Sequence, residues 1–201
     1  MSGAAGAWRR LFLPEPARVN PLALAGRALV LAALSVWGLR LITTPLEETP
    51  GSVMHYVNLP FHEAGHVIFM PLGGFMQVLG GTLMQLLMPL AALLTLLLKQ
   101  RDAFGASVAG WWLGQNLLDI APYISDARAG RLPLLGGVTG SQAPFFHDWH
   151  NILATLGWLE HDVFLARASF ALGAAVICGS LLWGGFCLAT QLKKVSAKSD
   201  G

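Results

Sequence analysis

Hydrophobic residues occur in five long stretches along the chain, and shorter, more polar segments separate them. The stretches cover residues 22–42, 59–79, 82–98, 103–124 and 163–192. A helix needs roughly 20 predominantly apolar residues to cross the hydrocarbon core of a bilayer. Four of the five stretches therefore predict full transmembrane helices.

The second stretch departs from this pattern because a proline and a glycine pair interrupt it. Pro71 and the Gly73-Gly74 pair follow about twelve residues of helical character, which at 1.5 Å of rise per residue cover only ~18 Å. Proline ends or kinks a helix because it lacks a backbone N–H and clashes with the preceding turn. The stretch predicts a short helix that enters the membrane and turns back through a membrane-dipping, glycine-rich hairpin.

The elements together predict an all-α polytopic membrane protein. We expect a single membrane domain over residues 22–192, preceded by an N-terminal segment over 1–21 and followed by a basic tail over 193–201. Within the membrane domain, residues 55–130 are expected to hold the functional site. A polar loop is expected over residues 125–162.

The composition supports the membrane class and excludes nucleic-acid binding. Hydrophobic residues make up 54% of the chain and charged residues only 12%, too few to cover a soluble domain. The net charge is +2, and no basic run is interleaved with aromatic residues as a nucleic-acid groove requires. Cys178 and Cys187 lie in the last hydrophobic stretch, so neither a disulfide framework nor a cysteine-ligated metal is expected.

The positions of basic residues predict the orientation, because Lys and Arg are enriched in cytoplasmic loops. If residues 59–98 make one net crossing, the N-terminal arginines, the pair Lys99 and Arg101, and the lysines of the tail all face the cytoplasm. If both halves of 59–98 cross, Lys99, Arg101 and the tail lie outside, while Arg128 and Arg131 lie inside. We favour the first arrangement, with an uncleaved N-terminal anchor in a bacterial inner (plasma) membrane and a cytoplasmic N-terminus.

Residues 62–66 read His-Glu-Ala-Gly-His, the HExxH pattern of zinc hydrolases. Residues four apart share a helix face, so His62 and His66 can ligate one zinc ion while Glu63 faces a water bound to it. In this chemistry the carboxylate accepts a proton from the water and later delivers it to the leaving amine. Asn58 and Pro60 predict a helix start capped by Asn58, which places Glu63 near the positive end of the helix dipole.

A catalytic zinc site has three protein ligands, so a third remains to be found. Asp119 and Asp126 are candidates in the fourth hydrophobic stretch and just beyond it. They are seven residues apart and share a helix face if the helix continues through Pro122. The spacing alone does not choose between them.

A second group of candidate ligands lies in the polar loop. Residues 146–151 read FHDWHN and contain His147, Asp148 and His150. The same residues also fit an interfacial amphipathic turn with Trp149 at the level of the lipid headgroups. The residues therefore leave the third ligand open among Asp119, Asp126 and this loop cluster.

Three segments together resemble the site-2 protease family of intramembrane zinc metallopeptidases. They are FHEAGHVIF at 61–69, the glycine-broken PLGGFMQVLGG at 71–81, and NLLDIAP at 116–122 with an aspartate downstream. The resemblance covers about residues 55–130. It implies a helical membrane fold in which a hairpin follows the HExxH helix and a later helix supplies an aspartate ligand.

The resemblance also implies roles for individual residues. It implies His62 and His66 as zinc ligands, Glu63 as the general base, Asp126 as the aspartate ligand, and Asn116 as a residue near the substrate backbone or oxyanion. The expected function is hydrolysis of a peptide bond in a membrane-embedded protein or peptide, with the lipid bilayer as surroundings.

Two other functions compete with this expectation. The first is a non-catalytic zinc-binding membrane scaffold related to such proteases. The second is a haem-binding redox protein, which is disfavoured because His62 and His66 share one helix face and suit one small ion. For the peptidase, the glycine-rich residues 73–81 are expected to offer an edge to an extended substrate.

Overall fold

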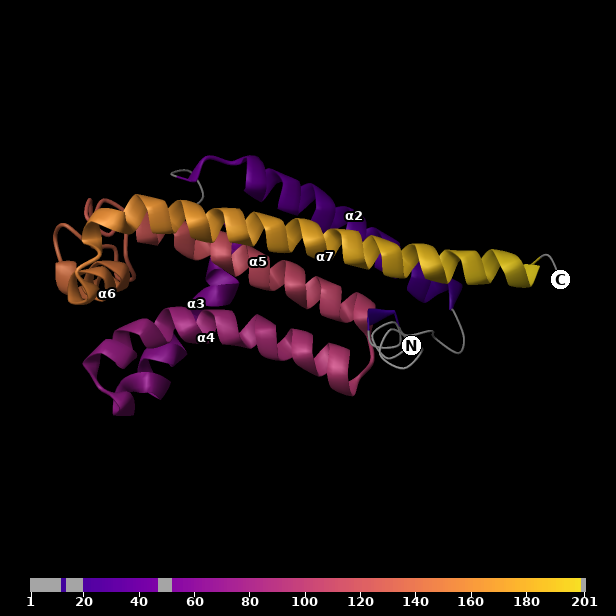
Figure 1. Cartoon of the computed structure of the whole chain (residues 1–201), viewed down its shortest axis with the longest axis horizontal. Coiled ribbons are helices and arrows are strands. Elements are labelled where there is room, and N and C mark those ends of the chain that lie inside the picture. Colours follow the sequence, from indigo (N-terminus) through magenta and orange to yellow (C-terminus); the bar gives the residue numbers. More distant parts are fainter. Residues whose placement is uncertain (1–11, 14–19, 47–51, 200–201) are drawn as a thin grey trace, which may run out of the picture. The chain divides into compact units, whose positions relative to one another are not determined.

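The computed structural model describes residues 12–13, 20–46 and 52–199, and these residues form helices joined by turns (Figure 1). The only β pairing among them is an isolated bridge between Pro133 and Thr139. The predicted all-α class is confirmed. The main helices are α2 (Pro21–Thr43), α3 (Val53–Phe69), α4 (Gly74–Leu94), α5 (Ala103–Ser125), α6 (Asp148–Leu156) and α7 (Asp162–Ser199).

Short helical turns join several of these helices. A 3-10 turn, η2 (Met70–Leu72), connects α3 to α4, and a π-helical turn, η3 (Thr95–Lys99), extends α4. Two further 3-10 turns, η4 (Pro144–Phe146) and η5 (Leu159–His161), flank α6. The predicted polar loop therefore contains a helix of its own.

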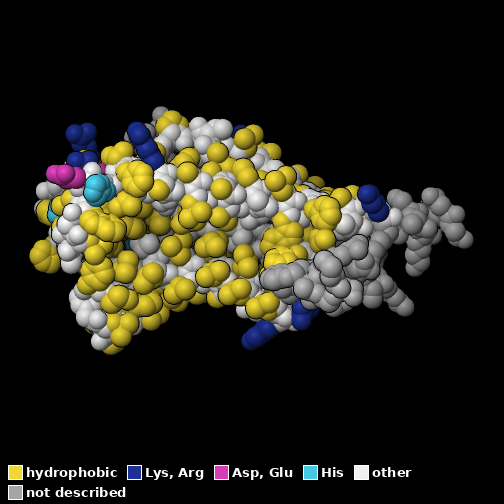
Figure 2. All heavy atoms as spheres, in the orientation of Figure 1, with side chains coloured by type: hydrophobic (Ala, Val, Ile, Leu, Met, Phe, Trp, Pro, Cys, Tyr) yellow, Lys and Arg dark blue, Asp and Glu magenta, His cyan; other side chains and the backbone are white. Residues whose placement is uncertain are grey.

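Three helical segments of the described chain are long and apolar enough to cross a membrane. They are Pro21–Thr43, Gly74–Lys99 and Leu159–Lys193. The visible face of the molecule carries mainly hydrophobic side chains and few charged ones (Figure 2). The membrane class is supported, but the predicted count of four spanning helices is not reached by these criteria. The remaining predicted span, residues 103–124, forms helix α5, which is not among these three segments and contains the polar residues Gln115, Asn116 and Asp119.

The predicted orientation in the membrane depends on basic residues that the structure describes only in part. Arg9, Arg10 and Arg18 lie outside the described residues, as do the side chains of Lys194 and Lys198. The cytoplasmic N-terminus therefore stays a prediction.

The helices contribute to two compact units. The first contains the described residues up to Arg40, residues 89–113 and residues 175–199. In this unit Trp111 donates a hydrogen bond to the Leu34 carbonyl oxygen at 3.1 Å. A Cβ on Gly38 would lie 2.8 Å from the Trp111 ring nitrogen, so only glycine allows this close packing.

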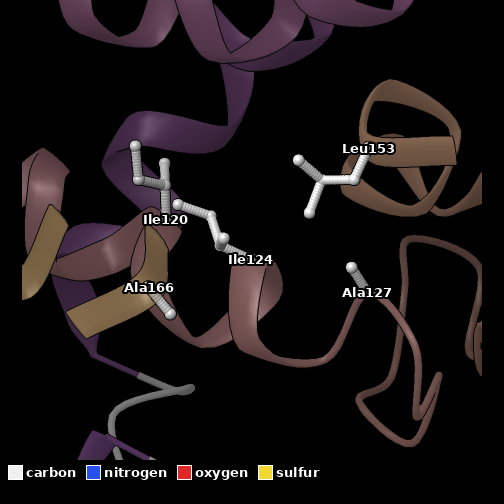
Figure 3. Packing of buried hydrophobic residues seen from close by; sticks show 5 residues of the cluster. All are labelled: Ile120, Ile124, Ala127, Leu153 and Ala166. Carbon is white, nitrogen blue, oxygen red and sulfur yellow. The ribbon is translucent and has the colours of Figure 1, made fainter. Parts of the chain in front are cut away.

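The second unit, residues 41–88 and 114–174, contains every predicted site residue. Its apolar core joins α5, α6 and the start of α7 and consists of Ile120, Ile124, Ala127, Leu153 and Ala166 (Figure 3). Arg128, just after α5, makes two hydrogen bonds to Asp162 at 2.8 and 2.7 Å. Leu153 holds α6 in this core, and with it Asp148, the first residue of α6.

The break between α3 and α4 lies where the sequence predicts it. Gly73 has a φ of 99° and donates its N–H to the Met70 carbonyl oxygen at 3.1 Å. This left-handed conformation favours glycine and ends the preceding turn. Residues from Gly74 onward form regular α-helix whose backbone groups bond within the helix, so residues 74–81 offer no extended edge, contrary to the expectation.

The predicted start of the HExxH helix is wrong. α3 has 17 residues rather than about twelve and begins at Val53, where the Ser52 hydroxyl accepts the N–H of Met54 at 3.3 Å. Asn58 lies inside the helix and turns its amide to a buried hydrogen bond instead of capping. Glu63 is therefore beyond the first turn, where the helix dipole no longer acts on it directly.

Candidate metal centre

The two histidines of the HExxH motif face α4 because α3 and α4 touch through glycines. A Cβ on Gly65 would collide with the backbone carbonyl of Gly80, and a Cβ on Gly80 would lie 2.6 Å from the Gly65 carbonyl oxygen. Two helix backbones approach this closely only where neither has a side chain at the crossing. His62 and His66 flank this crossing and are therefore held against α4.

Each histidine is oriented by a hydrogen bond from its Nδ1 atom. His62 Nδ1 lies 3.0 Å from Gln85 Oε1, and His66 Nδ1 lies 2.9 Å from the backbone carbonyl oxygen of Gln77. Carbonyl oxygens only accept, so each Nδ1 carries a proton and donates it. The Nε2 lone pairs of both rings are then available for a metal, the arrangement typical of metal-ligating histidines.

The two Nε2 atoms point to one place, which is bounded by Gly81 of α4. A Cβ added to Gly81 would lie 2.7 Å from each Nε2 atom. The rings are 4.9 Å apart between centroids and nearly perpendicular, at 80°. The missing side chain of Gly81 leaves room beside the converging nitrogens.

Asp148, the first residue of α6, brings a carboxylate to the same place. Its Oδ2 atom lies 2.8 Å from His62 Nε2 and 3.2 Å from His66 Nε2. Burial by itself raises the pKa of Asp148, but its close contacts with the two histidines outweigh it and hold the pKa below its ordinary value. A carboxylate oxygen so close to two imidazole nitrogens calls for positive charge between them, supplied by protons or by a cation.

Glu63 completes the cluster. Ligand atoms of His62, Glu63 and His66 lie within 4.8 Å of one another. Glu63 is partly buried and lines the same cavity as the histidines. The predicted clustering of His62 and His66, with Glu63 beside them, is therefore present in the structure.

Asp119 lies behind His62 and His66, and its hydrogen bonds go to other side chains. Its carboxylate accepts hydrogen bonds from Asn58 Nδ2 at 3.0 Å and from Gln85 Nε2 at 2.9 Å, and it lies 3.2 Å from His55 Nδ1. Gln85 thus joins Asp119 at one end of its amide to His62 at the other. In this position Asp119 orients His62 through Gln85 instead of contacting its ring.

Asp126 follows α5 directly, and its carboxylate binds the backbone of the loop that comes after it. Its two carboxylate oxygens accept the backbone N–H groups of Arg131 at 2.8 Å and Leu132 at 2.9 Å. The same carboxylate lies 3.4 Å from His147 Nε2. These contacts do not bring Asp126 to the paired histidines.

The remaining loop residues hold the start of α6. His147 caps this helix, and its Nδ1 accepts the N–H of His150 at 3.2 Å. His150 Nδ1 in turn lies 2.7 Å from the Ala127 carbonyl oxygen. Burial lowers the pKa of His147, and the Asp126 carboxylate opposes part of this effect. Both histidines position Asp148, which lies between them.

The cluster opens into a cavity of about 660 Å³. Its polar wall carries the candidate metal residues together with His55, Asp119 and Tyr123, and its apolar wall includes Leu59 and Ile120. Asn116 is fully buried in α5 and is not among the residues that line this cavity. An apolar cavity with a few convergent polar groups is typical of a ligand-binding site.

Comparison with models of protein families, with characterised proteins and with solved structures finds no match to this chain. The relationship to the site-2 protease family therefore stays a hypothesis drawn from the residues.

Sequence reasoning missed Gln85 and Gly81, which shape the site from α4. Gln85 carried a signal, because a polar residue inside an apolar stretch usually has a partner or a task. Gly81 carried none, because its effect depends on which face of α4 meets α3.

Proposed function

We propose that this protein is a zinc-dependent intramembrane metallopeptidase that hydrolyses a peptide bond in a membrane-embedded protein or peptide. The observation that supports this function is the convergence of His62 Nε2 and His66 Nε2 on the Asp148 carboxylate, with Glu63 beside them. Two imidazoles and one carboxylate are a frequent ligand set of catalytic zinc, which keeps a further position for water.

The residues present fit zinc. Both Nδ1 atoms donate to fixed acceptors, and this leaves the Nε2 lone pairs for the ion. Gly81 leaves the space that an ion beside both nitrogens needs. In this proposal His62, His66 and Asp148 hold the zinc, and Asp148 replaces Asp126 and Asp119 as the third ligand.

Glu63 is the general base in the proposed reaction. When bound, zinc supplies Lewis acidity that makes a neighbouring water more acidic. Glu63 accepts a proton from that water and then donates it to the nitrogen of the leaving amine. The substrate backbone has to be locally unwound, because peptide groups inside an intact helix are hydrogen-bonded and shielded from attack. The apolar wall of the cavity holds the unwound segment away from bulk water.

Metal analysis and hydrolysis assays on the purified full chain test this function. H62A, H66A and D148A should each lose stoichiometric zinc, whereas D126A should keep it. E63Q should keep zinc and lose hydrolysis of peptides, and this separates a peptidase from a zinc-binding scaffold. Zinc retained in D148A but lost in D126A would contradict the ligand set. Hydrolysis at the wild-type rate in E63Q would contradict the mechanism.

A further inference from the structure

One side of α3 forms a continuous stripe along the cavity. His55, Leu59, Glu63 and His66 all line it and recur at intervals of three or four residues, the spacing of one helix face. His55 precedes His62 by seven residues, which at 1.5 Å per residue separates them by about 10 Å along the helix. The cavity therefore has a second polar position at the opposite end of this stripe from the metal centre.

His55 is held in a fixed orientation at that position. Its Nδ1 lies 3.2 Å from Asp119 Oδ1, and the Asp119 side chain already accepts N–H groups from Asn58 and Gln85, so Nδ1 is placed to donate. The ring stacks on Tyr123 with centroids 5.7 Å apart and planes inclined by 15°. The His55 side chain keeps 22% of its surface exposed, whereas that of Asp119 keeps 3%. His55 thus faces the cavity, and Asp119 supports it from behind.

The Tyr123 hydroxyl makes a long contact with His55, which a stronger acceptor on a ligand can replace. It lies 3.5 Å from His55 Nε2, at the outer limit of a hydrogen bond. A phenol with an ordinary pKa of about 10 is protonated at neutral pH and donates through its O–H. None of the steps assigned to the metal centre uses this hydroxyl or the His55 ring.

We propose that Tyr123, positioned by His55, forms a substrate subsite in which its hydroxyl donates a hydrogen bond to a backbone carbonyl oxygen about three residues from the scissile bond. This subsite rests on the proposed peptidase function. An extended peptide rises about 3.3 Å per residue, so three residues cover the ~10 Å between His55 and the metal centre. Leu59 and Ile120 line the wall in between and favour apolar side chains on the intervening residues.

The subsite selects for an extended backbone. Within an intact helix a backbone carbonyl oxygen already accepts an N–H group of its own helix and is shielded from a second donor. A peptide that is unwound over about four residues places one carbonyl at the metal centre and another at Tyr123. Asp119 acts here as a positioning residue, because it fixes His55 and, through Gln85, also His62.

A backbone-modified peptide series tests the subsite. The probe is an internally quenched decapeptide of Ala, Leu and Phe, assayed with the zinc-loaded full chain in detergent, with cleavage sites mapped by mass spectrometry. In companion peptides each carbonyl in turn is replaced by a methylene group. One replacement, about three residues from the cut and on only one side of it, should raise KM about five-fold and leave kcat unchanged. A five-fold change is the effect of one lost hydrogen bond.

The variant Y123F should reproduce this loss. It should raise KM for the unmodified peptide about five-fold, leave kcat and zinc content unchanged, and abolish the further effect of that methylene replacement. Y56F is the matched control, because Tyr56 is exposed and lies outside the residues that line the cavity. H55L should raise KM in the same direction.

The outcomes separate the two proposals. Cleavage by Y123F with a wild-type KM would refute the subsite and leave the peptidase function standing. A fall in kcat or in zinc content of Y123F, with KM unchanged, would also refute it. No cleavage by the zinc-loaded wild type would refute the peptidase function and the subsite together.

Discussion

Replacing Gly81 by alanine perturbs the proposed metal centre with one methyl group. The new Cβ would lie 2.7 Å from His62 Nε2, 2.7 Å from His66 Nε2 and 2.6 Å from His66 Cε1. Favourable contact between such atoms begins at about 3.5 Å, so each ring has to retreat by about 0.8 Å or rotate. The atoms that collide are the tips of side chains, so the rings can move while the backbone stays in place.

The expected effect falls on zinc affinity and not on folding. Zinc–nitrogen bonds are about 2.0–2.1 Å long and tolerate errors of only about 0.2 Å, so ligands displaced by about 0.8 Å no longer share one ion. We expect zinc affinity to fall at least 100-fold, beyond the 10- to 100-fold typical of lost supporting hydrogen bonds. Alanine in a helix interior is itself more favourable than glycine by roughly 0.5–1 kcal/mol, so the metal-free fold should persist.

Zinc affinity is measured by competition with a chromogenic chelator, and helix content by circular dichroism. G74A is the matched control: it lies in the same helix, and a Cβ there meets nothing within 4 Å. We expect G74A to bind zinc as the wild type does. Wild-type affinity in G81A with wild-type helix content would refute the position assigned to the ion, because no ion could then lie beside both Nε2 atoms.

Three further predictions concern the support of the site. Leu153 is 1% exposed, so L153A should destabilise the protein by about 2–5 kcal/mol in denaturant unfolding, whereas L156A, at an exposed position of the same helix, should change stability little. Q85L removes the hydrogen-bond acceptor of His62 and should weaken zinc binding 10- to 100-fold. Q77L should not weaken it, because His66 donates to the backbone carbonyl of Gln77 and not to its side chain. Equal zinc affinities of the two variants would contradict this reasoning. Zinc at about 100 times its Kd adds ~2.7 kcal/mol of stability. Because Glu63 is not a proposed ligand, a chelator should lower the Tm of E63Q by as much as it lowers the Tm of the wild type. A wild-type Tm that a chelator does not change would exclude a tightly bound ion.

The buried polar network explains why α3, α4 and α5 have one arrangement in this unit. Asn58 donates to Gln115 Oε1 at 2.9 Å and to Asp119, and Asp119 also accepts from Gln85. Polar groups in an apolar interior are costly unless each has a partner. A rotation of any one helix would break several of these bonds at once, so the network fixes the direction in which His62 points.

The sequence by itself determined the helical class, the membrane character and the shared face of His62 and His66. These follow from local rules, because apolar length sets a span and a spacing of four places two residues on one helix face. The break near Gly73 is also local, since glycine adopts positive φ at little cost.

Only the tertiary structure decided which carboxylate meets the paired histidines, and where their helix begins. Asp126 matches the expected motif, but its oxygens are taken by the backbone of the following loop, whereas Asp148 reaches both Nε2 atoms from a separate helix. Asn58 looks like a helix cap in sequence but satisfies its amide across the helix interface. Spacing along a chain fixes which residues share a face. Which faces meet depends on packing between segments far apart in sequence, here on contacts as close as that between Gly65 and Gly80.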